Sequence, residues 1–199
     1  MNFWLVRYMS WNEVFSKGIN LWVKLYESGD KYYKYEGNLW RSLLKCFREM
    51  AEKKGLPFEE LQQEKNIVGN SRVDFLFGKE VSFEVKFEPD YPGMPTTRKP
   101  VTNVVLKAPD RAVAEYAGLT DAEARMRLYE VELDFLKLMA HKERGIPYNY
   151  LLCLDEDGRL HRNLARSFKT RQVKKLTIPW KLIRRGIDGQ EVYYFLWQA

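Results

Sequence analysis

The chain has 199 residues, of which 45% are hydrophobic and 15% aromatic, so it is long enough to form one well-packed domain. It has no apolar run of roughly eighteen residues and no signal-peptide order at its N-terminus, so we expect a cytoplasmic protein without a membrane segment. Its two cysteines and two histidines lack zinc-ligand spacing, which argues against a zinc site, and its net charge of +6 favours a polyanionic partner.

Residues 1–34 are rich in aromatic side chains. Ser10-Trp11-Asn12-Glu13 has the form of a capping box, and apolar residues follow at helical spacing, which predicts a helix over about residues 11–27. The rings can pack in the core, join two copies of the chain or stack on unpaired bases. We expect core or dimer packing, and the surplus of rings motivates a homodimer as one prediction.

A second helix is predicted from about Glu36 to Lys54, with Gly55 just after its end. Glu36 projects from the inward side of its first turn. A carboxylate at this place can stabilise the N-terminal dipole of the helix, or it can belong to a functional site. The sequence leaves both readings open.

Three strands are then predicted, over residues 61–68, 73–77 and 81–87, the last two forming a hairpin. In the third strand, Phe83, Val85 and Phe87 share one face, whereas Glu84, Lys86 and Glu88 share the other. Because unpaired buried charges are costly, the charged face needs partners or water. Glu64, in the first strand, is expected to be exposed.

Asp74 and Glu84 lie on the two neighbouring strands of this hairpin. Two carboxylates held close together repel each other, and a hard divalent cation with oxygen ligands relieves that repulsion. Mg²⁺ fits such a pair, with Mn²⁺ as its substitute. Lys86 beside them can hold a water or hydroxide, or neutralise charge that develops on a phosphate.

Asp74, nine intervening residues and Glu84-Val85-Lys86 resemble the D-x(n)-E-x-K signature of the PD-(D/E)XK nuclease superfamily, with Val73 at the position of the family's Pro. The resemblance implies an α/β, restriction-endonuclease-like fold: a mixed sheet flanked by helices, with an αβββαβ core over about residues 36–155. One domain would comprise this core, an extra aromatic N-terminal helix within residues 1–34 and a basic C-terminal extension over residues 159–199.

The same resemblance implies roles for the site residues. Asp74, Glu84 and the backbone carbonyl of Val85 would bind Mg²⁺ or Mn²⁺. Lys86 would orient the attacking water or help to deprotonate it. Glu36 matches a Glu that many members carry on the helix before the first core strand, and it would complete the acidic cluster.

The segment after the third strand contains four prolines between residues 89 and 100, which predicts a loop beside the site. Arg98 and Lys99 in this loop can contact phosphates, or the loop can be a passive spacer. A short strand is expected over residues 101–107, and a short helix from Asp110 to Tyr116.

A capping box at Thr120 and a long apolar stripe predict a helix that continues to about Arg144. Its charged residues Glu130, Asp134 and Lys137 are explained by solvent exposure. Residues 148–154 then form a buried strand, expected to run parallel to an earlier one, and Asp155-Glu156-Asp157-Gly158 forms a turn. Residues 192–197 are predicted to form a closing strand.

Residues 159–185 contain ten Lys or Arg side chains and no Asp or Glu. Such a tract favours a nucleic-acid backbone, although a solvated surface or a face for acidic protein or lipid headgroups has the same composition. With Arg98 and Lys99, the residues predicted to contact DNA are Arg162, Arg166, Lys169, Arg171, Lys174 and Lys175.

These patterns together predict a metal-dependent endonuclease that hydrolyses DNA phosphodiester bonds. Two alternatives remain: a non-catalytic nucleic-acid-binding or accessory protein with the same fold, and a protein-interaction module. In the second alternative, Asp74, Glu84 and Lys86 form only a cross-strand salt bridge.

Overall fold

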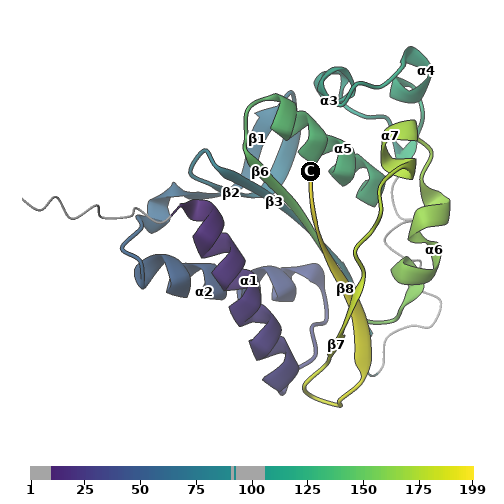
Figure 1. The fold of residues 1–199 in the computed structure, drawn as a ribbon. Helices are drawn as coiled ribbons and strands as arrows, with labels where there is room; N and C mark the ends of the chain where they lie inside the picture. Colours follow the sequence, from purple (N-terminus) through teal and green to yellow (C-terminus); the bar gives the residue numbers. More distant parts are fainter. Residues whose placement is uncertain (1–9, 91, 93–105) are drawn as a thin grey trace, which may run out of the picture.

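In the computed structural model, which describes residues 10–90, 92 and 106–199, the chain folds into a mixed six-stranded sheet with helices on both faces (Figure 1). The strand order is β1-β2-β3-β6-β8-β7. β3 and β6 pair in parallel, and the other neighbours pair antiparallel. The strands are β1 Leu61–Val68, β2 Ser71–Phe77, β3 Val81–Glu88, β6 Tyr148–Asp155, β7 Lys181–Arg184 and β8 Glu191–Gln198.

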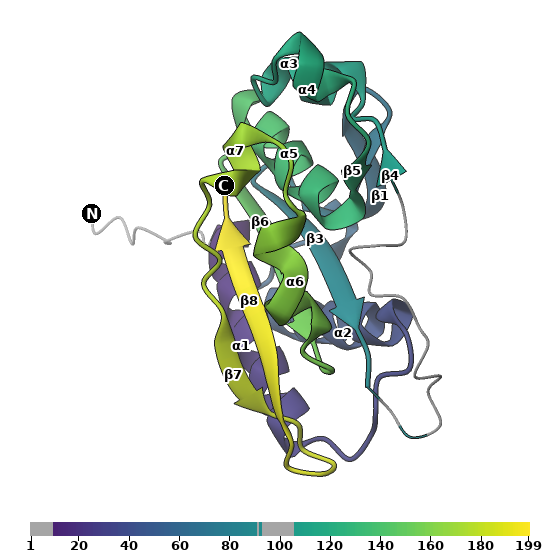
Figure 2. The same ribbon diagram turned by 90° about the vertical axis from the view of Figure 1, so that its right-hand side faces the viewer.

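Helices α1 and α2 cover one face of the sheet, and α5, α6 and α7 cover the other (Figures 1 and 2). α3, α4 and a small second sheet of β4 and β5 lie beside α5. The bounds are α1 Trp11–Ser28, α2 Glu36–Glu52, the 3₁₀ helix η1 Phe58–Glu60, β4 Leu106–Lys107, α3 Arg111–Tyr116, α4 Asp121–Ala124, β5 Leu128–Tyr129, α5 Glu130–Glu143, α6 Arg159–Ser167 and α7 Arg171–Lys174. None of the helices in the described part of the chain is both long and apolar enough to span a bilayer.

The core under α1 and α2 is dominated by aromatic rings. Phe15 of α1 and Phe47 of α2 stack with their centroids 5.5 Å apart, and both contact Phe83 of β3 edge to face. At Gly18, a Cβ atom would clash with the ring of Phe47, so only glycine lets the two helices approach this closely. The rings of α1 that sequence analysis assigned to core or dimer packing thus pack within the chain's own core, so they do not themselves call for a second copy.

The opposite face has its own core, in which Phe135 of α5 packs against Phe195 and Trp197 of β8. Residues 159–199 were expected to form an extension, but β7 and β8 are part of the main sheet because β8 pairs with β6 along most of its length. The two layers place the apolar side of β3 under α2 and its charged side under α5.

Most of the strong local patterns correspond to real elements. The helix predicted over residues 11–27 is confirmed, as are the three consecutive strands and the parallel pairing of the buried strand. The long helix from Thr120 to Arg144 is wrong. Its capping box is present, but α4 ends at Ala124, and Leu128–Tyr129 pairs with β4 before α5 begins. That pairing partner lies about twenty positions earlier in the chain, so helical spacing alone could not reveal it.

Candidate active site

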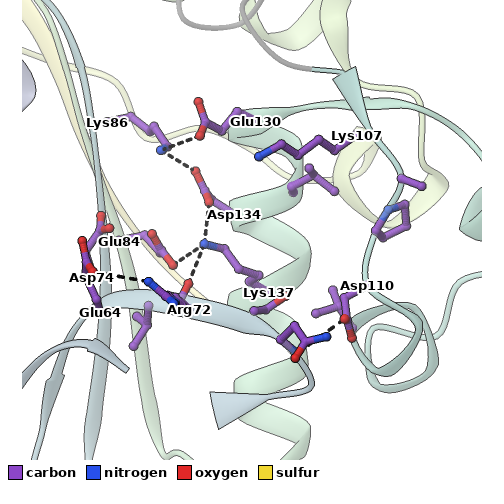
Figure 3. A pocket seen from close by; sticks show the side chains of 17 residues that line it. Glu64, Arg72, Asp74, Glu84, Lys86, Lys107, Asp110, Glu130, Asp134 and Lys137 are labelled. Carbon is purple, nitrogen blue, oxygen red and sulfur yellow. Dashed lines mark hydrogen bonds and ion pairs between the residues drawn. The ribbon is translucent and has the colours of Figure 1, made fainter. Parts of the chain in front are cut away.

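A cavity of about 520 Å³ opens between the β2–β3 edge, α5 and the segment of Lys107 to Asp110 (Figure 3). Its volume falls within the range of ordinary ligand pockets, about 300–1,000 Å³. Its lining is unusually rich in charge for so small a space. The charged side chains that line it are Glu64, Arg72, Asp74, Glu84, Lys86, Lys107, Asp110, Glu130, Asp134 and Lys137.

Asp74 sits where β2 and β3 stop pairing. The ladder between these strands runs from Phe77 opposite Val81 to Phe75 opposite Phe83. One residue farther along β2, the Asp74 side chain takes the place of a backbone acceptor: its Oδ2 accepts a hydrogen bond of 2.8 Å from the Val85 N–H. This bond fixes the carboxylate at the edge of the cavity.

The carbonyl of Val85 projects toward the same edge. β3 bonds to β6 through its even-numbered residues, since the carbonyls of Glu80 and Glu88 accept from the neighbouring β6 segment. In a strand, the N–H and C=O of one residue point to the same side. The Val85 N–H points to Asp74, so the Val85 carbonyl also faces β2, beyond the point where the ladder ends.

Glu84 is on the face of β3 that α5 covers, and only 1% of its surface is exposed. Lys137 of α5 donates a hydrogen bond of 2.5 Å to its Oε1. The buried charge of β3 therefore has the partner that its burial requires. That partner comes from the helix whose charges the sequence analysis attributed to solvent.

Lys86 is also covered by α5. Its Nζ lies 3.3 Å from Oδ2 of Asp134 and 3.7 Å from Oε1 of Glu130. The other oxygen of Asp134 pairs with Lys137 at 2.9 Å. Two lysines and three carboxylates thus form one connected network across the cavity wall (Figure 3).

Burial and crowded charge shift the pKa values of these groups. Burial raises the pKa of Asp74 to about 7, against the opposing charge of Lys86. Burial, followed by the nearby charge of Asp74, raises the pKa of Glu84 well above its usual range. Burial acts to lower the pKa of Lys86, but the surrounding carboxylates, Asp134 first, outweigh it and hold the pKa well above normal. Both lysines remain charged, whereas the two carboxylates are short of positive partners.

Glu36 begins α2, as predicted, and is partly buried. Burial raises its pKa to about 7, and the charge of Lys86 is the strongest opposing influence. The charges of Asp134, Glu130 and Glu84 also act on it. Glu36 is therefore in the same electrostatic environment as the cavity residues, although it is not among the residues that line the cavity.

The oxygen donors at the β2–β3 edge suit a hard divalent cation. Among the described residues, no group of three or more His, Cys, Asp or Glu side chains is arranged to hold a metal ion. The available set is smaller: the carboxylates of Asp74 and Glu84 and the carbonyl of Val85. Mg²⁺ commonly binds through one or two carboxylates and keeps several waters, so this donor set fits it.

Comparisons with known proteins were negative. No protein-family model, curated protein or solved structure matches this chain. The chemistry of the cavity therefore rests on its own residues and on the D-x(n)-E-x-K pattern.

Glu64 also lines the cavity, from β1. Its φ of 47° is in the left-handed region, where a residue other than glycine is strained. Its carboxylate lies 3.5 Å from the exposed guanidinium of Arg72. The expected exposure of Glu64 is confirmed, and it forms part of the cavity rim.

The predicted nucleic-acid contacts fall into different surroundings. Arg98 and Lys99 lie outside the described residues. Arg162, Arg166, Lys174 and Lys175 are exposed on or next to α6 and α7, on the face of the sheet that also carries the cavity (Figure 2). Arg171 and Lys169 are exposed too, although the Lys169 ammonium donates to the carbonyl of Arg127.

Not all of the basic tract faces solvent. Arg185 is 3% exposed and pairs with Glu156 and Asp188. Arg159 pairs with Asp157 and with the buried Glu88. These two arginines hold the ends of strands together, so they are structural rather than part of an open basic surface.

Sequence reasoning recorded Glu130, Asp134 and Lys137 but gave them the wrong environment. Asp134 is 2% exposed, and Lys137 bonds to Glu84. A signal was present, since the three residues are spaced i, i+4 and i+7 and so form one stripe on a helix. Such a stripe complements the alternating charges of β3, which also needed partners.

Proposed function

We propose that this protein is a metal-dependent endonuclease that hydrolyses phosphodiester bonds in DNA, and that its sheet and flanking helices are a restriction-endonuclease-like core. The observation that carries the proposal is the convergence of Asp74, Glu84 and Lys86 on one cavity. The chain order α2, β1, β2, β3, α5 and β6 agrees with an αβββαβ core once the short elements are set aside. The sequence pattern and the geometry of the cavity thus favour the same chemistry.

The charge balance supports a cation at this place. Asp74, Glu84, Asp134 and Glu130 face only two ammonium groups, those of Lys86 and Lys137. When all are ionised, the excess equals the charge of one divalent ion. Glu36 adds a further acidic group nearby. Bound Mg²⁺ or Mn²⁺ would supply Lewis-acid stabilisation of the charge that grows on the phosphate.

The protein groups have separate tasks in this scheme. Asp74, Glu84 and the Val85 carbonyl hold the ion. Lys86, kept protonated by Asp134 and Glu130, donates hydrogen bonds that orient a water or a phosphate oxygen. Glu36 supports the acidic side of the site through its charge, directly or through water.

The exposed basic residues of α6 and α7 would bind the phosphate backbone of DNA. Such contacts position the substrate without reading its sequence, so binding should weaken steeply with salt. Because these helices and the cavity lie on the same face of the sheet, one polyanion can contact both (Figure 2).

A non-catalytic DNA-binding protein is the second candidate. It is favoured by the ion pairs of Glu84 with Lys137 and of Lys86 with Asp134, because they satisfy the buried charges without an added ion. A protein-interaction module stays a third alternative, in which the basic face meets an acidic partner.

The test is plasmid cleavage. Supercoiled plasmid, single-stranded DNA and branched DNA are incubated with the protein and Mn²⁺, beside a Lys86→Gln variant. We expect wild-type cleavage and its loss in the variant. Lys142→Gln removes an exposed lysine from the same helix that covers the site and should cut normally. Thermal melts of each variant establish that it is folded.

Two results would separate the candidates. If folded wild-type protein cuts none of these DNAs, but shifts them in an electrophoretic assay with EDTA, the non-catalytic protein is supported. If it neither cuts nor shifts DNA at low salt, the interaction module is favoured over both.

A further inference from the structure

Lys137 makes a set of contacts that resembles the coordination of a bound cation. Its Nζ donates to Glu84 Oε1, to Asp134 Oδ1 at 2.9 Å and to the backbone carbonyl of Arg72 at 2.9 Å (Figure 3). An ammonium group has three hydrogens, so these three oxygens can use all of them. The acceptors come from β3, α5 and β2, and Lys137 therefore links three elements of the site through one positive charge.

One of these acceptors is also a predicted metal ligand. Glu84 is buried, and Asp74 is close enough for its charge to act on it. In the structure, Lys137 supplies the positive charge that holds this carboxylate in place. A divalent ion bound by Asp74 and Glu84 would lie a few ångströms from the ammonium group. Like charges at that separation repel strongly even at an effective dielectric constant near ~20.

We propose that Lys137 is a positioning residue that acts as an internal substitute for the metal: it neutralises Glu84 in the metal-free protein and leaves this carboxylate when the divalent ion binds. The inference rests on the proposed metal site and adds to it an exchange between two cations. Lys86 differs, because its ion pairs are with Asp134 and Glu130 rather than with the two predicted carboxylate ligands.

The two remaining acceptors make the exchange local. After Lys137 leaves Glu84, Asp134 and the Arg72 carbonyl can still hold the ammonium at the wall of the cavity. Lys137 is 17% exposed at its side chain and lines the cavity, so it can turn outward without opening the core. Lys137 would thus limit metal affinity while it protects the metal-free fold.

The first measurement is calorimetric titration of Mn²⁺ into wild type, Lys137→Gln and Lys137→Arg. We expect Lys137→Gln to bind Mn²⁺ at least about tenfold more tightly, since the competing charge is gone. Lys137→Arg keeps the charge and should stay within about threefold of wild type, where threefold is a small part of the tenfold step. Lys142→Gln controls for loss of a positive charge elsewhere on α5.

The second measurement follows the side chain itself. Brief acetylation with mass-spectrometric readout compares Lys137 and Lys86 with and without saturating Mg²⁺. We expect Mg²⁺ to increase the labelling of Lys137 severalfold, while Lys86 changes less. In the absence of metal, Lys137→Gln should melt at a lower temperature than wild type because Glu84 and Asp134 lose their shared partner.

The outcomes are distinct for the two proposals. If wild type binds Mn²⁺ and Asp74→Asn does not, but Lys137→Gln binds no more tightly than wild type, the cation exchange is overturned and the metal site stands. Unchanged Lys137 labelling at saturating Mg²⁺ overturns it as well. If neither wild type nor Lys137→Gln binds Mn²⁺, both the exchange and the metal-dependent function are refuted.

Discussion

Replacing Asp74 with Asn removes a carboxylate from the cavity and keeps an oxygen that can accept the Val85 N–H. Asp74 has a pKa raised from its ordinary 3.8 to about 7, so the folded protein retains a proton that the unfolded chain has already lost. Where the folded state binds more protons, stability falls as pH rises. The contribution of Asp74 is therefore an increasing penalty between about pH 4 and pH 7.

The size of this penalty follows from the shift. Between pH 5 and pH 7 the unfolded chain is deprotonated at this position and the folded protein is not. Each pH unit corresponds to 1.36 kcal/mol, so the two units give about 2.7 kcal/mol as an upper bound. Asp74 is partly accessible to the cavity, so we expect about 1–3 kcal/mol.

Urea denaturation in EDTA at pH 5 and pH 8 measures this difference. We expect Asp74→Asn and wild type to be similarly stable at pH 5, and the variant to be more stable by about 1–3 kcal/mol at pH 8. Asp121→Asn, which removes an exposed carboxylate from α4, should show no such dependence on pH. The reasoning is refuted if Asp74→Asn is destabilised by the same amount at both pH values, because the carboxylate would then be structural.

Three further predictions concern other parts of the molecule. Replacing both Arg162 and Arg166 with Gln should weaken DNA binding and flatten its salt dependence by up to about 0.9 per lost phosphate contact, whereas Lys45→Gln on α2 should not; equal salt slopes in filter binding would contradict this. Burial lowers the pKa of His141 to about 3, so the protein should lose stability as pH falls from about 6.5 toward 3; His141→Gln should reduce that loss, and an unchanged pH profile of unfolding would count against it. Gly18→Ala should cost about 1–3 kcal/mol in urea unfolding because its methyl group would clash with Phe47, and a stability equal to wild type would show that the α1–α2 contact yields easily.

Local pattern was sufficient to predict the elements that hold the predicted site residues. The alternation in β3 separated Phe83, Val85 and Phe87 from Glu84, Lys86 and Glu88, and the structure places the first set in the core under α1 and α2. The spacing of Asp74 and Glu84 on either side of a short turn was also enough to bring both to one cavity. Strand alternation and hairpin pairing depend on nearby residues, which is why the sequence predicts them well.

The partners of those charges could not be predicted in the same way. Asp134 and Lys137 look solvent-exposed in isolation, and their burial depends on α5 packing over β3, about fifty residues away in the chain. The break between α4 and α5 depends likewise on the pairing of β5 with β4.

Sequence alone thus determined which carboxylates and which lysine share a pair of strands, because a two-residue repeat decides on which face a side chain lies. Only the tertiary structure decided that a second lysine occupies Glu84 and that part of the basic tract is buried. Those facts depend on which distant surfaces meet, and the free energy of a buried charge is set by the partner it finds there.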